Sequence, residues 1–272
     1  MTLASPCPFK SLIQRSSVAL AMVGGCGVAV AADLPDFTLA PSTVVKGAAP
    51  IKADNMLVSD FAKVVFGAGN TFSESGFLAV TGFQLDGVQV ANAELNKDYG
   101  LYIQFAGSGT LSQTGNPSLV PNFGSFSSLT YTLYAYTGPA ATFAINSVTN
   151  DATTTAAGAI ALASGSLMSG TVSSTPGPGS LFSPTASALL SFNVLKNDFF
   201  TAPSPFYNMA FASFTNSPSQ VTVFSGGFNI EKGGGSINFA PMAPIPEPET
   251  YALMLAGLGA VAFVARRRRR VD

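Results

Sequence analysis

Residues 128–136 read Ser-Leu-Thr-Tyr-Thr-Leu-Tyr-Ala-Tyr, and their apolar side chains recur at every second position. One face would carry Leu129, Tyr131, Leu133 and Ala135, and the other Ser128, Thr130, Thr132, Tyr134 and Tyr136. A period of two is typical of a β-strand with one buried face. The stretch therefore predicts a half-buried strand.

The same alternation recurs on both sides of this stretch, at residues 101–105, 190–194, 221–223 and 237–239. Asp86-Gly87 separates two short apolar runs, and Asp-Gly suits a type I′ turn because both central residues need positive φ. Residues 150–185 are mainly Ala, Gly, Ser and Thr, and predict a weak strand at 159–168 followed by a loop. Together these patterns predict one antiparallel all-β domain, a β-sandwich or a jelly-roll-like pair of sheets.

The amino-terminal segment has the pattern of a secretory signal peptide. Lys10 and Arg15 precede an uncharged run of small and apolar residues at 16–30, and Ala31-Ala32 offers small residues for cleavage before Asp33. We therefore expect a signal peptide at 1–32 and a secreted β body at 33–240.

The carboxyl-terminal segment combines three features. Residues 241–249 form a Pro-rich linker, residues 250–265 are uncharged and mainly apolar, and residues 266–272 form a basic tail. As a helix, 250–265 would span about 24 Å, slightly less than a bilayer core of about 30 Å. We expect a short transmembrane helix with its basic end in the cytoplasm, because positive residues stay inside. The topology signal consists of Arg266, Arg267, Arg268, Arg269 and Arg270.

This tail resembles the PEP-CTERM sorting signal of Gram-negative bacteria, with Pro246, Glu247 and Pro248 as the sorting motif. The resemblance implies that an exosortase-type peptidase removes the tail near this triplet. It also implies that the protein is released or attached at the cell surface or in a polysaccharide-rich extracellular matrix. An ordinary tail anchor is the alternative.

The body resembles the flocculation-associated PEP-CTERM proteins. The similar segments are Leu34-Pro35-Asp36-Phe37-Thr38-Leu39, Lys52-Ala53-Asp54-Asn55, Phe72, Gly76-Phe77, Gly82-Phe83, Leu95 and Tyr99-Gly100-Leu101-Tyr102. What this resemblance implies is a matrix protein that helps cells adhere within an exopolysaccharide. It carries over no catalytic residue.

Composition argues against several other functions. The chain has no histidine, which removes the Ser-His-Asp triad, the Cys-His pair and imidazole zinc sites. Eleven acidic and six basic side chains between Asp33 and Ile245 give the body a net charge near −5, which disfavours nucleic acid as a partner. We expect no catalytic residue and no enzyme activity. The acidic residues Glu74, Asp86, Glu94 and Asp98 are interpreted as solvated turn and edge residues. The alternative is that two of them form the carboxyl pair of a secreted glycan-acting hydrolase.

Two kinds of binding site are left open. No cofactor is expected, although oxygen ligands at Asp33 with Asp36, Asn96 with Asp98, or Asn150 with Asp151 would suit a structural calcium ion. The possible glycan contacts are the aromatic side chains of Tyr102, Tyr134 and Tyr136, whose alternative role is cross-strand packing.

The leading hypothesis is a non-catalytic, exosortase-sorted extracellular matrix protein that supports flocculation or biofilm formation. Its expected partners are the peptidase, an exopolysaccharide, the membrane through the carboxyl-terminal helix, and further copies of itself through exposed sheet edges. The alternative is a membrane-anchored surface domain that binds a carbohydrate or small ligand.

Overall fold

A computed structural model describes residues 34–241 except 93, 113–119 and 179–180. The expected signal peptide, the sorting motif at 246–248, the helix at 250–265 and the five arginines lie outside these residues. Where the structure describes the chain, no helix has the length and apolarity needed to cross a membrane. The described body is built mainly from antiparallel β-strands, as the alternating sequence predicts.

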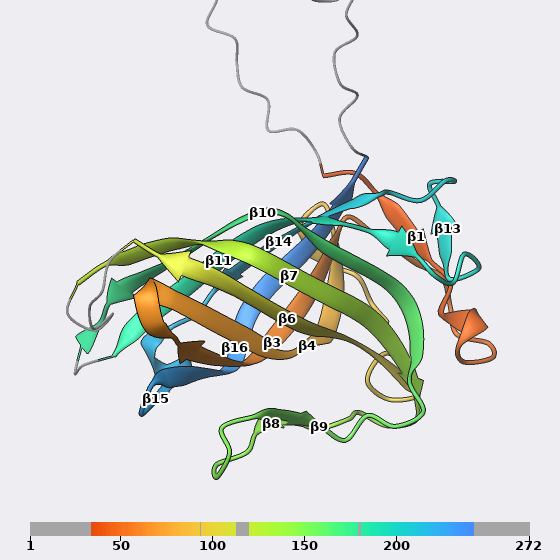
Figure 1. The fold of residues 1–272 in the computed structure, drawn as a ribbon. Helices are drawn as coiled ribbons and strands as arrows, with labels where there is room; N and C mark the ends of the chain where they lie inside the picture. Colours follow the sequence, from red (N-terminus) through yellow and green to blue (C-terminus); the bar gives the residue numbers. More distant parts are fainter. Residues whose placement is uncertain (1–33, 93, 113–119, 179–180, 242–272) are drawn as a thin grey trace, which may run out of the picture. The chain divides into compact units, whose positions relative to one another are not determined.

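Eight long strands form a closed barrel (Figure 1). In order around the barrel they are β11 (Phe182–Ser191), β14 (Met209–Thr215), β16 (Gly227–Ala240), β3 (Asn55–Phe66), β4 (Thr71–Leu85), β6 (Tyr99–Leu111), β7 (Asn122–Thr137) and β10 (Ile160–Pro176). The ladder between β10 and β11 joins the two ends of this series and closes the sheet. Each of the eight strands thus has a hydrogen-bonded strand on both sides.

The prediction of antiparallel β structure is confirmed, but the sheet closes on itself and does not divide into the two facing sheets of a sandwich. Alternation shows that each strand has one buried face, which is equally true of a sandwich and a barrel. The strand that turns the expected sandwich into a barrel is β10, for which the sequence predicts a weak strand at 159–168 followed by a loop. It runs for 17 residues, and its second half pairs with both β7 and β11.

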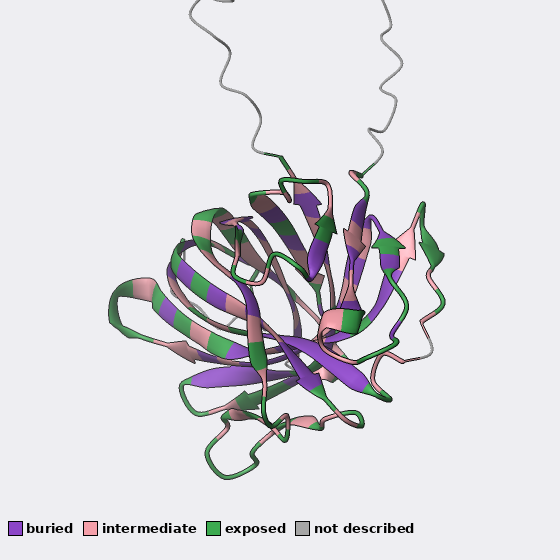
Figure 2. Ribbon diagram, turned by 90° about the vertical axis from the view of Figure 1, so that its right-hand side faces the viewer, coloured by how far each residue is buried: buried purple, intermediate pink, exposed green. Residues whose placement is uncertain are grey.

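Buried residues alternate with more exposed ones along the barrel strands (Figure 2). In β7, Leu129, Tyr131, Leu133 and Ala135 are all buried, as the sequence pattern predicts. An interior of eight strands is just wide enough for side chains to fill it or to hold one small ligand. Inward-facing side chains therefore form the core.

Aromatic side chains fill the two ends of the barrel. At one end a small sheet of β1 (Phe37–Leu39), β2 (Ile51–Ala53) and β13 (Phe200–Ala202) places Phe37 against Phe83 and Phe239, with ring centroids 6.4 and 5.0 Å away. At the other end Phe182 packs on Phe228, with ring centroids 4.9 Å apart.

The remaining elements are short. Strands β5 (Val88–Gln89), β12 (Asn193–Val194) and β15 (Val221–Phe224) extend the main sheet, and 3-10 helices occur at Pro41–Thr43, Ala68–Asn70 and Pro218–Gln220. A separate hairpin of β8 (Phe143–Ile145) and β9 (Ala152–Thr154) lies outside the barrel against β3 and β4 (Figure 1).

The predicted Asp-Gly turn is confirmed. Leu85 pairs with Val88, and Asp86 and Gly87 have φ values of 52° and 75°. The Asp86 N–H also donates a 2.7 Å hydrogen bond to the buried carboxylate of Asp54. This bond ties the turn to the residue that precedes β3.

Candidate functional site

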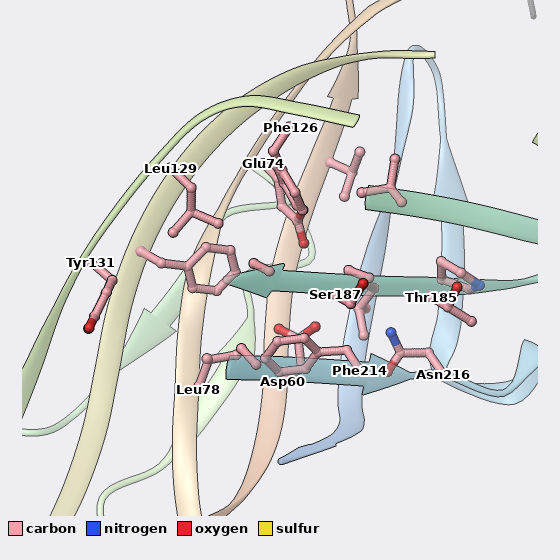
Figure 3. A pocket seen from close by; sticks show the side chains of 18 of the residues that line it. Asp60, Glu74, Leu78, Phe126, Leu129, Tyr131, Thr185, Ser187, Phe214 and Asn216 are labelled. Carbon is pink, nitrogen blue, oxygen red and sulfur yellow. The ribbon is translucent and has the colours of Figure 1, made fainter. Parts of the chain in front are cut away.

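A cavity of about 120 Å³ lies inside the barrel. It exists because two neighbouring strands, β11 and β14, contribute small side chains to the interior where most other strands contribute large ones. These small residues are Ala186, Ala188, Ala210 and Ala212. The rest of the wall is mainly apolar, with Leu78, Phe126, Leu129 and Phe214 among its residues (Figure 3).

Two carboxyl groups point into this cavity, Asp60 from β3 and Glu74 from β4 (Figure 3). The neighbouring pair between them, Ala62 and Gly76, leaves room because it carries almost no side chain. Asp60 is only 3% exposed. Glu74 is half-buried by surface area, and it lies inside the barrel among the residues that line the cavity.

Burial controls the ionisation of both groups. It raises the pKa of Asp60 well above its ordinary value, and the nearby charge of Glu74 raises it further. Burial also raises the pKa of Glu74 to about 7. Among the described residues, neither carboxyl group forms an ion pair with a lysine or arginine. The pair therefore favours the protonated form at a pH where exposed acids are ionised.

Sequence reasoning missed this site and misplaced Glu74, which is inside the barrel and not at a solvated edge. The signal was present in the alternation. Asp60 shares its parity with Met56, Val58, Ala62 and Val64, all on the buried face of β3. Glu74 likewise falls between Phe72 and Leu78 on the inward face of β4. An acidic residue at a position where the alternation of a strand otherwise places apolar residues predicts a buried carboxyl group.

The three tyrosines predicted as glycan contacts do come together, on the outer face of β6 and β7. The rings of Tyr102 and Tyr134 stack with centroids 5.2 Å apart, and the ring of Tyr136 lies 6.1 Å from that of Tyr102. Phe143 of the outer hairpin packs 5.7 Å from Tyr102. Tyr102 and Tyr136 are buried and Tyr134 is half-buried, so the cluster packs the hairpin against the barrel. A glycan contact here stays a prediction.

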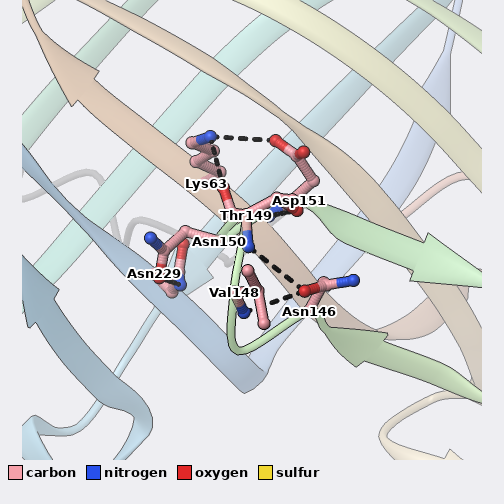
Figure 4. A network of polar contacts seen from close by, with 7 residues as sticks. All are labelled: Lys63, Asn146, Val148, Thr149, Asn150, Asp151 and Asn229. Atoms are coloured by element: carbon pink, nitrogen blue, oxygen red, sulfur yellow. Dashed lines mark hydrogen bonds and ion pairs between the residues drawn. The ribbon is translucent and has the colours of Figure 1, made fainter.

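A polar network holds the turn of the same hairpin (Figure 4). Lys63 Nζ donates to Asp151 Oδ1 and to the Thr149 carbonyl oxygen, both at 2.9 Å. Asn229 Nδ2 donates to Asn150 Oδ1 at 3.2 Å. The hydrogen bond from Lys63 holds the pKa of Asp151 below its usual value. The hairpin is thus fixed by aromatic packing along its strands and by polar contacts at its turn.

The sites considered for calcium already have ammonium partners. Asp151 pairs with Lys63, Asp36 with Lys52 at 2.6 Å, and Asp98 lies 3.9 Å from Lys97. Asp33 lies outside the described residues. No group of three or more acidic, cysteine or histidine side chains in the described part of the chain is arranged to hold a metal ion.

The outer face of β7, β10, β11 and β14 carries a shallow groove of about 490 Å³ lined by hydroxyl groups. The residues that we call the hydroxyl rows are Thr171, Ser173, Thr185, Ser187, Ser213 and Thr215. Cross-strand hydrogen bonds join Ser173 to Thr185 at 2.6 Å and Thr171 to Ser187 at 3.0 Å. Phe123, 57% exposed, lies at the end of one row.

The PEP-CTERM protein-sorting motif matches residues 244–270. It includes the Pro-Glu-Pro triplet, the apolar stretch and the five arginines, so the predicted resemblance of the tail is confirmed. The motif marks an exported protein that is recognised by exosortase and sorted to the cell surface. No curated protein and no solved structure matches the chain. The resemblance of the body to the flocculation-associated proteins is not shown by these comparisons.

The PEP-CTERM motif and the barrel have separate roles. The motif determines where the protein goes, whereas the barrel is the part of the described chain that presents surfaces for binding. It offers two such surfaces, the inner cavity and the outer hydroxyl rows.

Proposed function

We propose that the protein is a non-catalytic extracellular matrix protein that supports flocculation or biofilm formation in an exopolysaccharide. The PEP-CTERM motif at 244–270 carries this proposal, because it directs the chain to the surface. The body contributes a closed, sparsely charged barrel that holds its fold with no cysteine outside residues 1–32.

The hydroxyl rows support contact with a polysaccharide. Hydroxyl groups donate and accept hydrogen bonds, as the hydroxyl groups of sugars do. The exposed ring of Phe123 adds an apolar face beside them. Because the rows pass over the three adjacent strands β10, β11 and β14, an extended chain of sugar units can contact several hydroxyls at once. Many weak contacts of this kind give avidity without one tight site.

Deletion of residues 246–272 tests the sorting role. A sorting tail predicts mislocalised protein and loss of flocs, whereas a simple anchor predicts released protein that still supports aggregation. Replacing only Pro246, Glu247 and Pro248 by alanine is the matched control, since it leaves the apolar stretch and the arginines in place. The intact mass of the extracellular protein then shows whether processing has occurred. Full-length protein in washed inner membranes of an aggregating culture would contradict the proposal.

Retention of the purified protein on the producer's exopolysaccharide tests whether the hydroxyl rows bind the polysaccharide. Phe123→Ala combined with Thr171→Val is expected to reduce retention. Phe211→Ala is the matched control, because Phe211 is 46% exposed on β14 but does not line the groove. Equal retention of both variants would rule out the groove. Turnover of the polysaccharide by the purified protein would contradict a non-catalytic role.

The second candidate is a surface domain that binds a small ligand, and the cavity inside the barrel favours it. The carboxyl groups inside the barrel and the exposed ring of Phe123 on its outer face belong to different sites, although Ser173, Thr185 and Ser187 line both the cavity and the groove. The two functions are therefore compatible in one secreted protein.

A further inference from the structure

The cavity combines apolar walls with polar atoms that lack partners. Asp60 and Asn216 are 3% and 2% exposed, and Oδ1 of each accepts no hydrogen bond from another described residue. Both side chains line the cavity (Figure 3). Burying such an atom without a partner is unfavourable, so a ligand that contacts it gains binding free energy that the empty barrel lacks.

The described residues that line the cavity include acidic groups and no basic group. The titratable side chains that line it are Asp60, Glu74 and Tyr131. The hydroxyl group of Tyr131 already donates to the Ser191 carbonyl oxygen at 2.8 Å. The two acids have no basic partner in the described chain. A cation is therefore the group that would complete this site.

The size of the cavity limits the ligand. At about 120 Å³ it is slightly smaller than an engineered apolar cavity of about 150 Å³ that admits benzene. A ligand with about four carbon atoms fits this volume. The four alanines of β11 and β14 form the wall available to its hydrocarbon part.

We propose that the cavity binds a small apolar amine, with its ammonium group between Asp60 and Glu74 and its hydrocarbon chain against the alanine wall of β11 and β14. This inference concerns the interior of the barrel and does not depend on the matrix role. An ammonium ion donates charge-assisted hydrogen bonds to carboxylates, which are stronger than bonds between neutral groups. An apolar carboxylic acid would instead bring a third acidic group into the site. A neutral alcohol would satisfy single polar atoms but would leave an ionised Glu74 without a counter-ion.

Calorimetric titration of the purified full chain with n-butylamine and n-butanol tests the ligand class. These probes have nearly the same size and differ in charge. At pH 8 we expect butylamine to bind at least about tenfold more tightly than butanol. Glu74→Gln should remove this preference, because it removes the carboxylate that the ammonium group contacts. Glu231→Gln, on the exposed side of β16, is the matched control and should change neither affinity.

The pH dependence gives a second measurement of the same contact. Butylamine stays protonated below its pKa of about 10. Its affinity should rise by about tenfold per pH unit up to about pH 7, where Glu74 ionises, and any further rise would come from Asp60, whose pKa is raised by burial and by the charge of Glu74. Butanol affinity should be independent of pH.

A cavity-filling variant tests the location. Ala212→Leu adds a side chain to the alanine wall and should abolish binding of both probes while the circular dichroism spectrum is retained. Ala188→Val is the smaller replacement if Ala212→Leu does not fold. Equal affinities for the two probes would overturn the amine assignment. Absence of butylamine binding at millimolar concentration, or unchanged butylamine binding by the filled variant, would overturn the site.

Discussion

Replacing Glu74 by glutamine should change the stability of the barrel in a pH-dependent manner and stabilise it at pH 8. The reason is that Glu74 is more easily ionised in the unfolded chain than inside the barrel. Its pKa rises from the model-compound value of 4.5 to about 7 on burial. Below pH 4.5 the group is protonated in both states and has no effect on the free energy of unfolding. As the pH rises from 4.5 through 7, ionisation favours the unfolded chain, and wild-type stability falls.

The expected magnitude follows from this shift. A rise of about 2.5 pKa units corresponds to about 3 kcal/mol at pH 8. The buried glutamine amide offsets about 1 kcal/mol of the gain at every pH, because part of it stays unpaired. Glu74→Gln should thus be up to about 1 kcal/mol less stable than wild type at pH 4.5 and about 2 kcal/mol more stable at pH 8.

Urea unfolding followed by tyrosine fluorescence at pH 4.5, 6 and 8 measures this difference, since the chain has no tryptophan. The linear dependence on urea gives the free energy of unfolding at each pH. Glu231→Gln is the control, because Glu231 is exposed on β16. A constant difference between Glu74→Gln and wild type across this pH range would refute the argument that burial perturbs Glu74.

Two further predictions concern the outer hairpin and the tyrosine cluster. Lys63→Met should remove the ion pair with Asp151 and cost less than about 1 kcal/mol, because exposed ion pairs contribute little. It should nevertheless speed amide hydrogen exchange at 146–151; unchanged exchange would show that the ion pair does not hold the turn. Gly100→Ala should destabilise the barrel by about 1–3 kcal/mol in thermal unfolding, because a Cβ at Gly100 would overlap the Tyr136 ring. Gly82→Ala, where a Cβ has room, is its control, and equal losses would contradict the overlap.

The sequence predicts the local structure of the body well. The alternation at 128–136 correctly identifies the buried side of β7, and Asp86-Gly87 correctly identifies a two-residue turn. Both are properties of short segments, whose side-chain period and backbone φ preferences are visible in the residues themselves.

Barrel closure could not be predicted in the same way, because it depends on β10. Its residues are mainly Ala, Gly, Ser and Thr, which have weak strand signals of their own. The strand forms because it gains a ladder on each side, from β7 on one side and from β11 and β12 on the other. The cavity depends in turn on closure, since Asp60, Glu74 and the alanines of β14 come from separate strands.

Closure of the barrel also affects how the secreted protein behaves at high concentration outside the cell. Open strand edges would let secreted chains template one another into cross-β fibres. Each long strand here is already flanked by two others. In the part of the chain that the structure describes, the barrel strands therefore have no open edge with which a second chain could pair. Cohesion between copies would then rest on side-chain contacts and on the smaller sheets at the periphery. In the matrix role that we propose, such contacts could break and reform, whereas a fibrous assembly would set permanently.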